Sequence, residues 1–191
     1  MIVWAAVVLL VICGLYLLAV QDHRLALLAV GVQYAGAALL VGTMWPFAMA
    51  VSRVVSGWMA VAILLVSIRQ SSAGDDPLAA NPGGQIFRLL TAVLVLLATV
   101  SLLEPVARVI PGIPLLPLLG AMWLVGNGLL QMGFSLHPLR TVLAWLTTLT
   151  GFELAYAAVE RSILMAALLA VLHLALALAG AYLLALPEAQ S

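Results

Sequence analysis

The sequence predicts an all-α, polytopic integral membrane protein of about seven transmembrane helices, built as two parallel three-helix units joined by a central helix. Hydrophobic residues make up 66% of the 191 residues and charged residues 7%, against about 45 to 50% and about 25% in soluble domains. Successive apolar runs meet or approach the ~20 residues that a helix needs to cross a hydrocarbon core of about 30 Å. These observations exclude a water-soluble fold.

Short polar or proline-bearing turns separate the apolar runs, as expected of tight helical hairpins. The first run lacks a basic segment and a small-residue cleavage site, so we expect a retained helix rather than a removed signal peptide. The predicted helices cover residues 2–20, 25–43, 47–68, 89–106, 114–135, 141–159 and 163–186. The turns that mark their ends are residues 21–24, 44–46, 104–108, 137–138 and 160–161.

One longer connection, residues 71–85, is rich in Gly, Pro, Ser, Asn and Asp and is too polar to enter lipid. We therefore expect a first three-helix unit over residues 1–70, the polar loop with a linker helix over 71–112, and a second three-helix unit over 113–191.

The two halves share a plan. A Gly-Leu pair opens a helical segment at Gly14 and again at Gly128, and each segment leads into a turn that bears His and Arg and then into a helix with a polar residue. The central helix would return the chain, so both units would have the same orientation. The sequence thus predicts a parallel repeat rather than an inverted one.

Arginine positions indicate the orientation in the membrane. With the N-terminus outside, the cytoplasmic turns hold more arginines than the outer turns do, in the usual positive-inside sense. Trp4 and Trp45 would then both lie at the outer interface, which indole rings favour. We expect a protein of the inner or plasma membrane with a cytoplasmic C-terminus. The cytoplasmic arginines would be Arg24, Arg69, Arg88 and Arg140, and the outer ones Arg108 and Arg161.

Composition narrows the classes of function. Seven basic residues, all Arg, balance seven acidic ones, so no basic surface for nucleic acid or anionic lipid is expected. The sequence lacks a P-loop, a dinucleotide fingerprint, HExxH and a nucleophile elbow, which leaves nucleotide binding and a catalytic site of its own without support. The single Cys13 excludes disulfide frameworks and Cys-ligated centres. We expect no cofactor, and lipid and apolar membrane proteins as partners.

Polar residues inside the predicted helices are the candidate proton-path residues, because ionisable groups in the hydrocarbon are costly and usually functional. Glu153 falls about 18 Å into its predicted helix. Thr150, Tyr156 and Glu160 share its side of the helix at helical spacing, forming a partly polar stripe. Glu153 is thus either a proton-relay carboxylate or a static partner of Arg53. Only residues 54–68, about 22 Å of helix, follow Arg53 in its run, so Arg53 should enter the membrane.

Two uncharged groups lie at a similar depth. His173 is about 15 Å into the last helix and Gln33 about 12 Å into the second from the opposite face. A neutral imidazole both donates and accepts, which suits a proton wire; a hydrogen bond between helices or axial ligation of a pigment are the alternatives.

DHRLALLAVGVQYAGAALL in the first half and PLRTVLAWLTTLTGFELAYAAVERS in the second resemble the HyfE family, the seven-helix membrane component of hydrogenase-4 and formate hydrogenlyase-type complexes. The C-terminal unit is similar to the small three-helix K-type subunit of respiratory complex I. The resemblance implies a buried Glu at Glu153 and a matching Gln at Gln33, whereas the last helix carries His173 where the family tends to have a carboxylate.

Together these features predict a non-catalytic membrane subunit of a complex I-like or membrane-bound hydrogenase-like ion-translocating complex. It would scaffold antiporter-like subunits and contribute Glu153, His173, Gln33 and Arg53 to a proton path. The alternatives are a stand-alone small transporter or channel, and a pigment- or haem-associated subunit of a photosynthetic or respiratory assembly.

Overall fold

Seven α-helices, and no strand, make up the part of the chain that the computed structural model describes, residues 1–70, 82–109, 112–134, 137–160 and 162–186. All seven are long and apolar enough to cross a membrane, which confirms the predicted fold class. The helices are α1 (Ile2–Ala19), α2 (His23–Val41), α3 (Phe47–Gln70), α4 (Pro82–Val109), α5 (Leu115–Phe134), α6 (Pro138–Val159) and α7 (Ile163–Ala185).

The helix ends differ from the predicted ends mainly where hydropathy stops being informative. Helix α6 begins at Pro138 rather than at residue 141, because a proline at the first helical position has no N–H to leave unbonded. Helix α2 begins at His23, and the Asp22 side chain caps it by accepting from the Arg24 backbone N–H at 2.8 Å. The predicted polar loop over residues 71–85 lies mostly outside the described residues.

Helix α4 departs furthest from the prediction. It starts at Pro82 and passes through Pro105 to Val109, whereas the sequence predicted a helix over residues 89–106, so residues 82–85 of the predicted loop are helical. Pro105 lies in the last turns, so its missing N–H disturbs the helix only near its end. At 1.5 Å per residue the 28 residues span about 42 Å, more than the hydrocarbon core requires.

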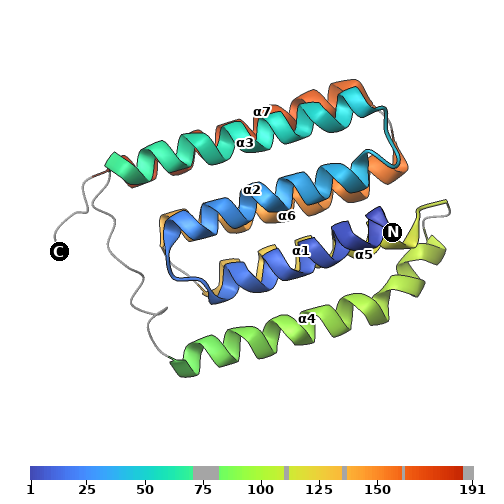
Figure 1. Cartoon of the computed structure of the whole chain (residues 1–191), viewed down its shortest axis with the longest axis horizontal. Coiled ribbons are helices and arrows are strands. Elements are labelled where there is room, and N and C mark those ends of the chain that lie inside the picture. The colour runs from blue at the N-terminus through green and yellow to red at the C-terminus, as the bar shows by residue number, and fades with distance from the viewer. Residues whose placement is uncertain (71–81, 110–111, 135–136, 161, 187–191) are drawn as a thin grey trace.

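The helices pack as three parallel pairs. Helix α1 lies against α5, α2 against α6 and α3 against α7, while α4 packs on the outside against α5 and α1. Figure 1 shows that both members of each pair run in the same direction, so α1–α3 and α5–α7 form two three-helix sets of equal orientation. We call the end of the bundle that carries Met1 the N-side and the opposite end the C-side.

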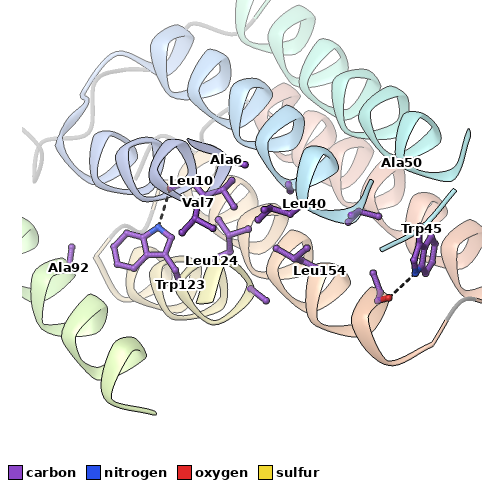
Figure 2. Close-up of a cluster of buried hydrophobic side chains, with 14 of the residues drawn as sticks. Ala6, Val7, Leu10, Leu40, Trp45, Ala50, Ala92, Trp123, Leu124 and Leu154 are labelled. Atoms are coloured by element: carbon purple, nitrogen blue, oxygen red, sulfur yellow. Dashed lines mark hydrogen bonds between the residues drawn. The ribbon is translucent and has the colours of Figure 1, made fainter. Parts of the chain in front are cut away.

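Two apolar clusters fill the interior. The first, called the Leu10 cluster, joins α1, α2, α5 and α6 and is drawn in Figure 2. Within it the Trp123 indole N–H donates to the Leu10 carbonyl at 3.1 Å, so a buried polar atom is satisfied. The second, called the Leu143 cluster, fills the C-side half between α2, α3, α6 and α7. Its members include Leu27, Val30, Ala60, Leu64, Leu139, Val142, Leu143, Leu146 and Ala177.

Glycines allow α5 and α6 to approach closely, as small residues do between membrane helices. A Cβ at Gly151 would lie 2.7 Å from the Val125 backbone N and 2.8 Å from the Ala121 carbonyl O. Gly151 is therefore a packing residue between α5 and α6, whereas an added Cβ at Gly31 or Gly133 would meet nothing within 4 Å.

Candidate functional site

An ion pair links α3 to α6 inside the bundle. Arg53 Nη1 contacts Glu153 Oε1, and the two residues are 7% and 6% exposed. Arg53 lies six positions after Phe47 and Glu153 six positions before Val159, so both lie about 9 Å from the N-side ends of their helices. The Arg53 and Glu153 pairing that the sequence offered as one alternative is present.

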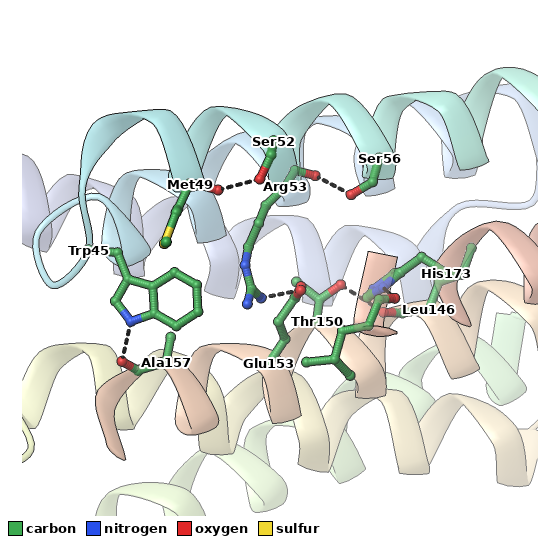
Figure 3. A network of polar contacts seen from close by, with 11 residues as sticks. Trp45, Met49, Ser52, Arg53, Ser56, Leu146, Thr150, Glu153, Ala157 and His173 are labelled. Carbon is green, nitrogen blue, oxygen red and sulfur yellow. Dashed lines mark hydrogen bonds and ion pairs between the residues drawn. The ribbon is translucent and has the colours of Figure 1, made fainter. Parts of the chain in front are cut away.

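Trp45 covers the guanidinium of Arg53 on the N-side. The ring centroid is 4.8 Å from Arg53 Cζ, and the indole N–H donates to the Ala157 carbonyl at 2.7 Å (Figure 3). A cation over an indole face is attracted by the ring electrons, more strongly when both are shielded from water. Trp45 lies in the turn between α2 and α3, at the N-side end, and is 4% exposed, whereas Trp4 is 60% exposed, so the Trp45 ring faces the interior of the bundle.

Deeper in the bundle the site continues through three more side chains. Thr150, one turn before Glu153, is buried and donates its hydroxyl to the Leu146 carbonyl at 2.7 Å. His173 of α7 and Tyr34 of α2 meet edge to face, with ring centroids 5.6 Å apart. Figure 3 shows the order along the bundle, with Trp45 at one end, the ion pair next, and Thr150 and His173 beyond it. We call these six residues, Trp45, Arg53, Glu153, Thr150, Tyr34 and His173, the polar cluster.

The imidazole of His173 has a defined hydrogen-bonding state. Its Nδ1 lies 2.8 Å from the Leu169 carbonyl, and because a carbonyl only accepts, Nδ1 carries a proton. In the neutral ring Nε2 is then an acceptor, and this atom is buried without a hydrogen-bond partner among the described residues. The Arg53 Nε and Nη2 are likewise buried, without a hydrogen-bond partner among the described residues. Buried donors and acceptors of this kind are where proteins hold ordered water.

The polar cluster extends through only one half of the bundle. His173 lies ten positions after Ile163, about 15 Å from the N-side end of α7. Beyond it, toward the C-side, the same four helices are filled by the Leu143 cluster. The polar cluster therefore leads from the N-side to the middle, and Thr147 of α6, one turn further, is buried with its hydroxyl unpartnered among the described residues.

Gln33 is the one candidate that the structure does not join to the others. It is buried on α2 at the expected depth, and its Oε1 accepts no hydrogen bond from a described residue. The polar stripe predicted on α6 is also divided: Thr150 and Glu153 are buried, whereas Tyr156 donates to Glu160 at 2.7 Å in an exposed pair. Glu153 and Thr150 thus belong to the bundle interior and Tyr156 and Glu160 to its N-side rim.

Sequence reasoning missed Tyr34 and the inward direction of the Trp45 ring. Tyr34 packs against Gly57 of α3, where a Cβ would collide with the phenol ring. The only sequence signal for Tyr34 was its position next to Gln33, a glutamine inside a predicted membrane helix. Nothing in the sequence indicated that the Trp45 ring turns inward.

The haem and pigment alternative finds no support in the geometry. His173 is 1% exposed and its ring is held between the Leu169 carbonyl and Tyr34. Axial ligation needs an open face on a ring nitrogen for a large macrocycle, and the packing around this imidazole offers none. Among the described residues no group of three or more His, Cys, Asp or Glu side chains could hold a metal ion.

Comparison with known proteins identifies no relative: no family model, no curated protein and no solved structure matches the chain.

Proposed function

We propose that this protein is a non-catalytic subunit of an ion-translocating membrane complex of the complex I-like or membrane-bound hydrogenase-like kind. In this proposal the polar cluster forms half of a proton path, from the N-side to the middle of the membrane. The resemblance of the segments around Gln33 and Glu153 to the HyfE family supports the class of complex. The buried Arg53 and Glu153 pair supports proton transfer, because charged groups at such depth are rare outside proton and ion pathways.

One observation carries the choice of a subunit over a stand-alone transporter. The polar cluster stops at His173 and the Leu143 cluster fills the remaining half of the same helices. A transporter needs access to its site from both sides of the membrane, whereas a subunit can pass a proton sideways to a neighbour. The second half of the path would then belong to an antiporter-like partner.

The residues have distinct roles in this proposal. Glu153 takes up a proton arriving from the N-side through ordered water, which neutralises it and loosens its contact with Arg53. The proton then passes to Nε2 of His173, while Nδ1 stays bound to the Leu169 carbonyl. Arg53 returns Glu153 to the charged form, and Trp45 holds Arg53 in place through its ring and its bond to Ala157. Gln33 stays a candidate on α2 next to this route.

We further infer that the N-side faces outward. Among the described arginines, Arg108 lies near the N-side end of α4, whereas the others outside the polar cluster lie on the C-side, the distribution expected when the C-side is cytoplasmic. The C-side set is Arg24, Arg69, Arg88 and Arg140.

Purification in mild detergent, followed by identification of bound proteins, tests the subunit role. We expect large antiporter-like membrane proteins to co-purify, and we expect the isolated chain to give no proton flux in liposomes. A chain that purifies alone and carries protons across liposomes would contradict the proposal and identify a stand-alone transporter.

A further inference from the structure

A small, partly open pocket lies on the C-side, away from the polar cluster. It is formed where α1, α4, α5 and α6 meet, and its lining is Leu17, Leu18, Arg88, Gln131, Phe134 and Arg140. Half of these side chains are apolar and the other half offer hydrogen-bond donors, two of them with a positive charge. The proton path does not use this pocket.

Both pocket arginines are buried and bind the C-terminal carbonyls of neighbouring helices. Arg140 of α6 donates from Nη1 to the Leu17 carbonyl at 3.1 Å, and from Nη2 to the carbonyls of Val20 and Gln21. Arg88 of α4 donates from Nη2 to the Phe134 carbonyl at 3.3 Å, with Cζ 5.7 Å from the Phe134 ring centroid. The negative ends of α1 and α5 thus hold two guanidinium groups beside one pocket.

Donors are left over in the pocket after these bonds. Arg88 has five N–H donors, and its hydrogen bond to the Phe134 carbonyl uses one of them. Gln131 is 9% exposed, and its amide Nε2 is buried with no hydrogen-bond partner among the described residues. Among the described residues, the carboxylate at this end of the bundle is that of Asp22. It caps α2 and does not line the pocket. The pocket is therefore suited to an anion that accepts several hydrogen bonds.

The depth of the pocket matches the headgroup region of a bilayer. Gln131 lies three positions before the end of α5 and Arg140 two positions after the start of α6, about 4.5 Å and 3 Å into these helices. Next to Arg88, helix α4 exposes Phe87, Leu90 and Leu94, an apolar surface along which acyl chains can pack. Basic pockets between transmembrane helices at this level bind the headgroups of anionic lipids.

We propose that this pocket binds the phosphate group of an anionic phospholipid on the C-side leaflet. Arg88 and Gln131 donate to the phosphate oxygens, Arg140 adds positive charge and fixes the end of α1, and one acyl chain lies along α4. The site rests on geometry separate from the polar cluster, so it stands or falls independently of the proton path.

Native mass spectrometry of the delipidated chain tests the site, with phosphatidylglycerol and phosphatidylcholine of equal acyl length as probes. We expect the anionic lipid to bind at least about fivefold more tightly. Arg88→Gln should abolish the difference, whereas Arg88→Lys should keep part of it. The matched control is Arg69→Gln, which removes the same charge from an exposed position on the same side, outside the pocket lining, and should change little.

Gln131→Leu provides a second test that leaves every charge and every helix-capping bond in place, and it too should weaken phosphatidylglycerol binding. Equal binding of the two lipids, or equal effects of Arg88→Gln and Arg69→Gln, would overturn the proposal. Inorganic phosphate serves as the third probe. If phosphate alone stabilised the chain against heat as much as phosphatidylglycerol does, the pocket would be a site for a free anion and the lipid assignment would be wrong.

Discussion

Arg53 and Glu153 tolerate their position in the hydrocarbon because each supplies the charge that the other needs. The mutual contact is supplemented by the Trp45 ring over the guanidinium. Removing one member of a buried pair leaves an uncompensated charge, whereas replacing both with apolar groups of similar volume is often neutral or stabilising. The pair is therefore a poor source of stability and a sensitive point for substitution.

This reasoning predicts opposite outcomes for single and double substitutions. Glu153→Gln should lower the free energy of unfolding by about 3–5 kcal/mol, because Arg53 keeps its charge without a partner. The double variant Arg53→Met, Glu153→Met should recover most of that loss. Unfolding of the purified chain in mixed detergent micelles measures both, with Glu104→Gln as the control at the exposed pair with Arg108. A double variant as unstable as Glu153→Gln would contradict this view of the pair.

At the level of the helices, the close contact of α5 with α6 determines where Glu153 points. Gly151 lies two positions before Glu153, directly against the α5 backbone, so the rotation of α6 is set by backbone contact. Helix α3 packs closely against α2 for a different reason: Gly57 has no side chain, which leaves room for the Tyr34 ring. The two glycines place Arg53 and Glu153 across the space between α3 and α6.

Gly151→Ala should destabilise the bundle by about 1–3 kcal/mol, because its Cβ would overlap backbone atoms of α5 that cannot move aside. Gly133→Ala is the matched control on α5. It meets no neighbour within 4 Å, and alanine is the better helix former, so it should be neutral or slightly stabilising. Thermal unfolding of the two variants separates the outcomes, and equal melting temperatures would show that the contact at Gly151 does not limit the packing.

The helices themselves could be predicted from the sequence because the thickness of the hydrocarbon dictates the length of an apolar run. Depth followed from the same arithmetic, which is why Arg53 and Glu153 could be paired in advance. Rotation about each helix axis follows from contacts between helices and leaves little trace in hydropathy. Gln33 was therefore grouped with residues that it does not bind, Tyr34 was missed, and the inward direction of the Trp45 ring was not predicted. The start of α6 at Pro138 was missed for a different reason, since helix caps outside the hydrocarbon depend on local backbone bonding.

In the whole molecule, the polar cluster lies among α2, α3, α6 and α7, whereas the Leu10 cluster lies mainly among α1, α2, α5 and α6, and Trp45 belongs to both. Helices α3, α4 and α7 present most of their surface outward. Such faces suit lipid or neighbouring subunits. The polar cluster lies among α2, α3, α6 and α7, two of which are outer helices, so a proton at His173 would be close to a partner docked there.

The orientation of the bundle makes a separate prediction. Cysteine introduced at Thr43, exposed on the N-side, should react with a membrane-impermeant maleimide in intact cells. Cysteine introduced at Gln21, exposed on the C-side, should react only after the membrane is opened. The native Cys13 is buried and gives a low background. The reverse pattern of labelling would place the N-terminus in the cytoplasm.

Proton translocation by the assembled complex that carries the Arg53→Met, Glu153→Met double variant tests the proposed role of the polar cluster most directly. Acidification of membrane vesicles is measured per amount of assembled complex, so that stability and transport are separated. If Glu153 passes protons to His173, the complex should assemble normally and lose most of its translocation. Normal assembly with unchanged translocation would contradict the proton path and leave the two residues as a structural link between α3 and α6.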